Sequence, residues 1–101
     1  MELNQRQDVL QSLRSAAGYL NDVIEMITAG APCDQVLRQS FAVQATLRNA
    51  SIRMLVYQAQ YSGTVIVESS CPEEIKSELK RLSELYLILI QYSNKSEDNI
   101  S

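Results

Sequence analysis

The chain has 101 residues, a formal net charge of −3 at pH 7 and no histidine. This length fits one small domain, and a hydrophobic content of 46% is typical of a folded chain. Without histidine, Ser-His-Asp catalysis, Cys-His catalysis and two-histidine zinc sites are excluded. We therefore expect a protein that is not an enzyme and carries no cofactor. The acidic pI near 4.8 disfavours a strongly basic nucleic-acid module, although it leaves room for a local basic patch.

The sequence predicts neither a membrane span nor an export signal. The longest apolar run, residues 85–90, is far shorter than the roughly 18 residues that cross a bilayer. The N-terminus lacks a cationic stretch followed by an apolar one. We therefore expect a cytoplasmic protein, in which Cys33 and Cys71 are free thiols.

The first predicted helix carries two neighbouring apolar stripes on one face, with heptad-like spacing. Residues 30–32 (Gly-Ala-Pro) end this helix and open the next one. The first stripe contains Leu10, Leu13, Ala17, Leu20, Ile24 and Ile27, and the second contains Val9, Ala16 and Val23 with Tyr19 and Met26.

Residues 34–61 are predicted to form a long second helix, whose two apolar stripes need partners on two sides. Residues 64–67 are β-branched and fit either the frayed end of this helix or an extended connector. One stripe contains Val36, Ser40, Val43, Leu47, Ala50, Met54, Tyr57 and Tyr61, and the other contains Leu37, Phe41, Ala45, Ile52, Leu55 and Ala59.

A third helix is predicted to begin with Ser70 as its N-cap and Pro72 in its first turn. Glu73 and Glu74 favour the positive end of the helix dipole, which explains them better than acid–base catalysis does. Residues 94–101 are expected to form a disordered polar tail, which leaves residues 1–93 as a single domain. The predicted buried face contains Ile75, Leu79, Leu82, Tyr86 and Leu89.

The predicted fold is therefore all-α, with three helices of which the central one is the longest. These helices carry more apolar surface than one chain of this size can bury, which predicts a homo-oligomer. A monomeric three-helix bundle is the alternative.

The ordered combination of short motifs between residues 10 and 60 resembles the CsoR/RcnR/FrmR family of small all-helical bacterial repressors. The resemblance rests on Gly18-Tyr19-Leu20, Val23 to Ile27, Gly30-Ala31-Pro32-Cys33, Val36-Leu37, Gln39, Ala42-Val43 and residues 45–47. It implies an antiparallel helical dimer that assembles into a tetramer. It also implies binding to operator DNA without a helix-turn-helix, weakened by an inducer at a cysteine site.

The resemblance also identifies the positions of a metal site, where this chain departs from the family. Cys33 matches the family's cysteine at the start of the second helix. Counting from Cys33 without gaps, Gln58 stands where copper-sensing members have a histidine and Ser62 where they have a second cysteine, both supplied by the neighbouring chain. An amide and a hydroxyl are poor ligands for Cu(I), so we expect a degenerate site that holds no metal tightly.

Cys33 is then the candidate sensor thiol. The helix N-terminus stabilises a thiolate there, while Asp34 opposes it. Such a thiol suits the sensing of an electrophile or a redox signal. The alternative is that Cys33 is an inert, half-buried packing residue. Cys71 does not match the family's second cysteine and is interpreted as structural.

Arg14, Arg38, Arg48 and Arg53 are the candidate DNA-binding residues. The arginines and acidic residues of positions 1–60 balance, so the whole −3 arises from residues 61–101. Arg48 and Arg53 also fit roles in solvating the second helix or pairing across a dimer. Two functions remain open: a repressor-type transcriptional regulator that binds operator DNA and itself, or a helical scaffold that has lost DNA binding.

Overall fold

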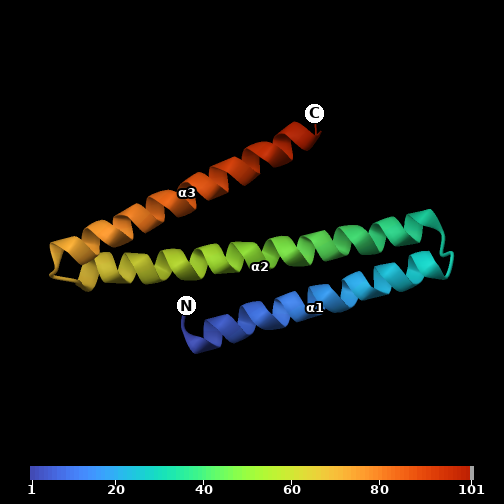
Figure 1. Ribbon diagram of the computed structural model, residues 1–101, viewed down its shortest axis with the longest axis horizontal. Coiled ribbons are helices and arrows are strands. Elements are labelled where there is room, and N and C mark those ends of the chain that lie inside the picture. Colours follow the sequence, from blue (N-terminus) through green and yellow to red (C-terminus); the bar gives the residue numbers. More distant parts are fainter. Residues whose placement is uncertain (101) are drawn as a thin grey trace. The chain divides into compact units, whose positions relative to one another are not determined.

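The computed structural model of the chain consists of helices α1 (Leu3–Thr28), α2 (Cys33–Glu68) and α3 (Pro72–Ile100) (Figure 1). It describes the backbone of residues 1–100 and the side chains of residues 1–92. Because that backbone contains no strand, the predicted all-α class is confirmed. The side chains of the predicted polar tail, residues 94–101, lie outside the described residues, and the tail boundary stays a prediction.

The chain divides into two compact units, Met1–Met54 and Leu55–Ser101, and α2 contributes to both. Among the described residues, no helix combines the length and hydrophobicity needed to cross a bilayer.

Local signals fix both ends of α1. At its start, the Glu2 backbone N–H donates to Gln5 Oε1 at 3.1 Å. At its end, Gly30 adopts a left-handed φ of 76°, which glycine reaches without a steric cost. The Gly30 N–H then donates to the Ile27 carbonyl and the Ala31 N–H to the Met26 carbonyl, at 3.1 and 2.9 Å. These two bonds form a Schellman motif, so the predicted stop at Gly30 is confirmed.

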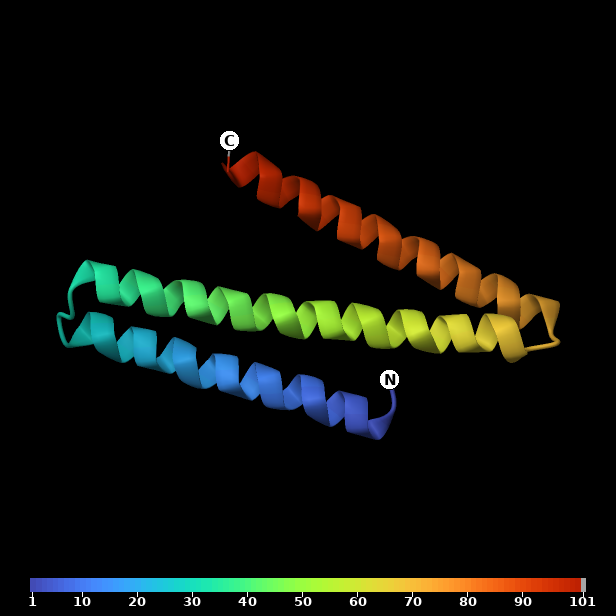
Figure 2. The ribbon, with the colours of Figure 1, turned by 180° about the vertical axis from the view of Figure 1, so that it is seen from behind.

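In the first unit, α1 runs antiparallel to the first part of α2 (Figures 1 and 2). The buried side chains of α1 come from the second predicted stripe. The two buried side chains of this part of α2 lie seven residues apart, on one face of the helix. Most of the first stripe stays on the surface, because within the unit α1 packs on α2 alone. The buried residues are Val9, Ala16, Val23, Val43 and Ala50, and exposed members of the first stripe include Leu10, Leu20, Ile24 and Ile27.

The second helix is longer than the sequence predicts, because it continues through residues 64–67 to Glu68. The expectation of an extended connector there is wrong, and the alternative of a helix end is correct. Thr64 Oγ1 donates to the Gln60 carbonyl at 3.0 Å, so the hydroxyl of this β-branched residue has a hydrogen-bond partner inside the helix. The Ser69 N–H also donates to the Val65 carbonyl at 2.9 Å, which extends the helical pattern past Glu68.

Cys71, and not the predicted Ser70, is the N-cap residue of α3, and the Ser69 side chain bonds to its N–H. Ser69 Oγ accepts the Cys71 N–H at 3.1 Å and donates to Glu74 Oε2 at 3.0 Å. The Cys71 carbonyl accepts the Ile75 N–H at 3.1 Å, which gives Cys71 the backbone role of an N-cap residue. Pro72 occupies the first helical position, as predicted.

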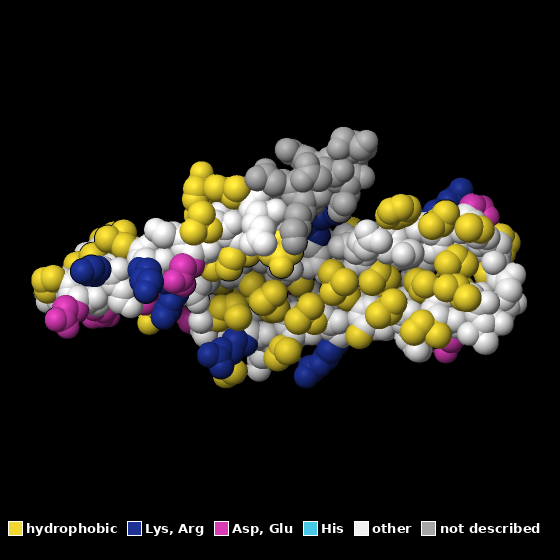
Figure 3. Space-filling model, turned by 45° about the horizontal axis from the view of Figure 1, so that its top comes forward, with side chains coloured by type: hydrophobic (Ala, Val, Ile, Leu, Met, Phe, Trp, Pro, Cys, Tyr) yellow, Lys and Arg dark blue, Asp and Glu magenta, His cyan; other side chains and the backbone are white. Residues whose placement is uncertain are grey.

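The predicted buried face of α3 is wrong for a single chain. Leu79, Tyr86 and Leu89 are exposed, whereas Ile75 and Leu82 are half-buried. Among the described side chains of α3, the buried one is Glu78. A single chain offers this helix one packing partner in its unit, so the remaining apolar surface faces outward. Figure 3 shows hydrophobic side chains spread over the visible surface of the molecule.

Candidate functional site

Cys33 is the first residue of α2, and its side chain is exposed. The helix starts immediately after Pro32, whose carbonyl accepts the N–H groups of Gln35 and Val36 at 3.1 and 3.2 Å. Asp34 occupies the same first turn. The description of Cys33 as a half-buried packing residue is therefore wrong within one chain, and its thiol is accessible there.

The two positions matched to metal ligands, Gln58 and Ser62, lie one turn apart on α2 and contact each other. Gln58 Nε2 donates to Ser62 Oγ at 3.3 Å, and Ser62 Oγ donates to Glu78 Oε2 of α3 at 2.7 Å. Ser62 is fully buried, and Glu78 is 7% exposed. Arg81 Nη1 lies 3.3 Å from the other carboxylate oxygen of Glu78. These residues form one polar network inside the second unit.

This network already uses the Ser62 hydroxyl and the amide nitrogen of Gln58. The Ser62 hydroxyl uses its hydrogen on Glu78 and accepts from Gln58. Amide and hydroxyl groups lack the softness that Cu(I) selects, so the residues present do not fit that ion. Within the described part of the chain, no group of three or more His, Cys, Asp or Glu side chains could hold a metal ion. Cys33 belongs to the other unit.

Sequence reasoning missed Glu78, although a signal for it exists. It falls three residues after Ile75 and four before Leu82, so it occupies the apolar phase of α3. A carboxylate at such a position needs a polar partner, because burying an unpaired charge is very costly. Its partner, Ser62, is separated from it by 16 positions, which no local pattern connects.

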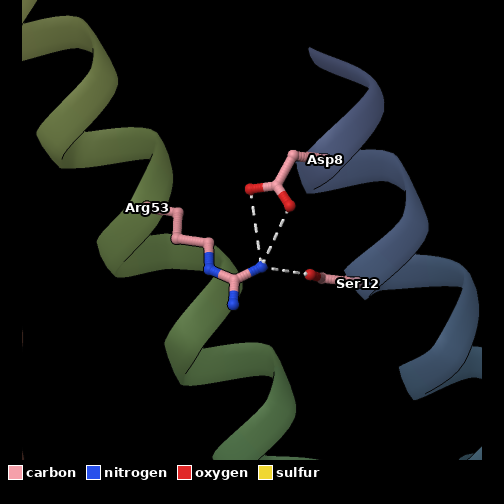
Figure 4. A network of polar contacts seen from close by, with 3 residues as sticks. All are labelled: Asp8, Ser12 and Arg53. Atoms are coloured by element: carbon pink, nitrogen blue, oxygen red, sulfur yellow. Dashed lines mark hydrogen bonds and ion pairs between the residues drawn. The ribbon is translucent and has the colours of Figure 1, made fainter. Parts of the chain in front are cut away.

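The candidate DNA-binding arginines fall into two groups. Arg14, Arg38 and Arg48 are exposed, and none forms an ion pair or side-chain hydrogen bond with another described residue. Arg53 does form such contacts with α1 (Figure 4). Its Nη1 donates to Asp8 Oδ1 and Oδ2 at 3.3 and 3.4 Å.

The same Nη1 atom of Arg53 also donates to Ser12 Oγ at 2.9 Å. The side chains of Arg53 and Asp8 are 48% and 40% exposed, and ion pairs with this exposure contribute about 0–1 kcal/mol. The pair therefore adds little to stability and leaves the guanidinium accessible to solvent. Arg53 therefore does more than solvate α2, because it also links α2 to α1.

Cys71 is also an exposed, free thiol. It precedes α3, and its backbone completes the cap described above. Its backbone therefore has a structural role, while its side chain does not contribute to a core within one chain.

These features define a class of protein. It is all-helical, with an exposed cysteine at the start of a long second helix and surface arginines on the first two helices. A family model described as "metal-sensitive transcriptional repressor" matches residues 5–89. The chain belongs to this family, and transcriptional repressors are not enzymes. No curated protein and no solved structure matches the chain.

Proposed function

We propose that this protein is a repressor-type transcriptional regulator that binds operator DNA. The observation that carries the proposal is the family match over residues 5–89. Exposed Arg14, Arg38 and Arg48 supply positive charge that the described contacts leave uncommitted. Arginines in this state are the groups that neutralise DNA phosphates.

Within this function, the family's metal site is degenerate. The hydrogen bonds from Gln58 to Ser62 and from Ser62 to Glu78 support this, because they bind both side chains to partners inside the chain. A thiol at Cys33 alone is too few soft ligands for tight binding of Cu(I). The regulator then responds to a signal other than this metal.

Cys33 is the sensing residue in this proposal, and its exposure supports the role. With an aldehyde, the Cys33 thiol gives its proton to water, its sulfur forms a bond to the carbonyl carbon, the carbon–oxygen π pair moves to oxygen, and water returns a proton to that oxygen. The product is a hemithioacetal at the start of α2. A redox signal acting on the same thiol is the second candidate inducer.

The protein acts as a homodimer or homotetramer in the cytoplasm. The exposed hydrophobic residues of α1, such as Leu20 and Ile24, support self-association, because exposed apolar stripes of this kind mark interaction surfaces. In an oligomer, several copies of each arginine can contact one DNA duplex.

The experiment is an electrophoretic mobility shift with DNA from upstream of the protein's own gene, at about 50 and 200 mM salt. A specific complex that weakens at the higher salt is expected. If the folded protein gives no specific, salt-sensitive shift, the regulator proposal is wrong and the helical scaffold without DNA binding replaces it.

Sensing is tested with Cys33→Ala and with Cys71→Ala as the matched control. Formaldehyde or a mild oxidant should release DNA from the wild type and from Cys71→Ala, but not from Cys33→Ala. Release that persists in Cys33→Ala excludes Cys33 as the sensor and leaves the DNA-binding proposal untouched.

A further inference from the structure

The Arg53–Asp8 pair lies in a shallow polar hollow between α1 and α2 of the first unit. Asp8, Ser12, Ser15 and Tyr19 follow one another at helical spacing along α1, and Gln11 lies beside them. Hydroxyl and amide groups of these types donate to phosphate oxygens in protein–DNA complexes. The hollow therefore has the chemistry of a contact to a nucleic-acid backbone.

The guanidinium of Arg53 is only partly used. All three of its hydrogen bonds start from Nη1, and Figure 4 shows the second terminal nitrogen pointing away from Asp8 and Ser12. The distances to the carboxylate, 3.3 and 3.4 Å, exceed the 2.7–2.9 Å of a strong charge-assisted bond. Asp8 thus holds Arg53 weakly, without the two-nitrogen geometry that makes arginine pairs strong.

The charges of the hollow cancel. Arg53 is the cation among its lining residues, and Asp8 is the anion. A DNA phosphate that approached Arg53 would therefore meet the Asp8 carboxylate at the same nitrogen. Removing that carboxylate leaves a net positive hollow bordered by hydroxyl groups.

We propose that Asp8 competes with the DNA backbone for Arg53, so that this ion pair holds down the protein's affinity for DNA. The inference rests on the proposed DNA-binding function and adds the regulation of one of its contacts. On binding, a phosphodiester oxygen replaces the carboxylate at Nη1, and the second terminal nitrogen provides the other half of a bidentate contact. Arg53 then changes partner from α1 to DNA.

The test compares Asp8→Asn with Asp22→Asn, which removes the same charge from an exposed position of α1. Binding to a fluorescent operator duplex is measured by anisotropy across a series of salt concentrations. Asp8→Asn should bind roughly threefold tighter or more at low salt, with a steeper slope of log K against log salt, because no carboxylate is left to take up a cation when Arg53 turns to the phosphate. Asp22→Asn should leave the slope as in the wild type.

The double variant Asp8→Asn with Arg53→Gln should lose the whole gain, because the phosphate contact requires Arg53. The inference is overturned if Asp8→Asn behaves like Asp22→Asn, or if its gain persists without Arg53. Should Asp8→Asn not fold, Arg53→Gln alone decides: an unchanged slope overturns the inference.

Failure of the underlying function looks different from failure of the inference. If neither the wild type nor any variant binds DNA, both are wrong. If the wild type binds and the Asp8 variant shows no specific gain, the DNA-binding function stands and the competition does not.

Discussion

At the scale of single residues, the hydrogen bond from Ser62 to Glu78 is the most consequential contact of the second unit. It is 2.7 Å long, and it joins a fully buried hydroxyl to a carboxylate that is 7% exposed. Hydrogen bonds to buried charged groups contribute more than those between neutral groups, because the charge has lost its water. We therefore expect Ser62→Ala to lower the free energy of unfolding by about 1–3 kcal/mol.

Urea denaturation at a fixed protein concentration measures this loss, because self-association would otherwise shift the apparent stability. Thr64→Ala is the control, since Thr64 is exposed and bonds to its own helix at Gln60. It should cost about 0.5 kcal/mol or less. Equal losses in the two variants would show that the Ser62–Glu78 bond contributes nothing special.

The proposed degeneracy of the metal site makes a second prediction at this scale. Replacing both Gln58→His and Ser62→Cys supplies the imidazole and thiolate that Cu(I) favours, with Cys33 of a neighbouring chain as the third ligand. The double variant should hold Cu(I) roughly tenfold more tightly than the wild type, or better still. Competition with a chromogenic Cu(I) chelator measures the affinity.

The matched control adds Cys33→Ala to the double variant, which should abolish the gain. An affinity for Cu(I) in the wild type equal to that of the double variant would instead mean that the native residues already form a working site.

The resemblance to a known family identifies Cys33, Gln58 and Ser62 as candidate site positions, because an alignment compares positions along the chain. It could not reveal how these side chains are bonded. The contacts that matter join residues 16 and 45 positions apart, from Ser62 to Glu78 and from Asp8 to Arg53. Such pairings depend on how helices face each other, and no short pattern encodes them.

At the scale of the helices, the two adjacent serines before α3 differ in their hydrogen bonds. Ser69 bonds to both the Cys71 N–H and the Glu74 carboxylate, whereas Ser70 has no side-chain hydrogen bond among the described residues. Losing a side-chain hydrogen bond of this kind costs about 0.5–1.5 kcal/mol. Ser69→Ala should therefore destabilise the protein by this amount, and Ser70→Ala should change its stability little.

Hydrogen exchange of the backbone N–H groups at Cys71 and residues 73–75 localises the effect. Exchange there should accelerate in Ser69→Ala and stay as in the wild type in Ser70→Ala. The reverse order of the two variants would restore Ser70 as the cap that the sequence predicts.

The helix ends differ in how well the sequence predicts them. The end of α1 follows from Gly30, because a left-handed residue and two backbone bonds form a local motif. The sequence places the end of α2 too early, since β-branched residues 64–67 also suit a strand. Lacking a second strand to pair with, that segment gains its backbone hydrogen bonds by staying helical.

At the scale of the whole molecule, charge and hydrophobicity are distributed differently. The first unit has no net charge, and the acidic excess lies in the second. Exposed hydrophobic residues, in contrast, occur on all three helices. Acidic charge repels both DNA and other copies of the chain, so the neutral first unit is the better candidate for DNA binding.

The exposed stripe of α1 gives the last prediction, which concerns self-association. Leu20 is 50% exposed. Complete burial of a fully exposed leucine side chain contributes about 1.5–3 kcal/mol to the free energy of association. The wild type should therefore have a light-scattering mass that is a multiple of 11.4 kDa. Leu20→Lys should shift this mass toward that of one chain, because it places a charge within the apolar stripe. Asn21→Lys adds the same charge at the neighbouring exposed polar position and should keep the wild-type mass. A monomeric wild type would support the monomeric three-helix bundle instead of an oligomer. Equal masses for Leu20→Lys and an oligomeric wild type would show that the interface does not include this stripe.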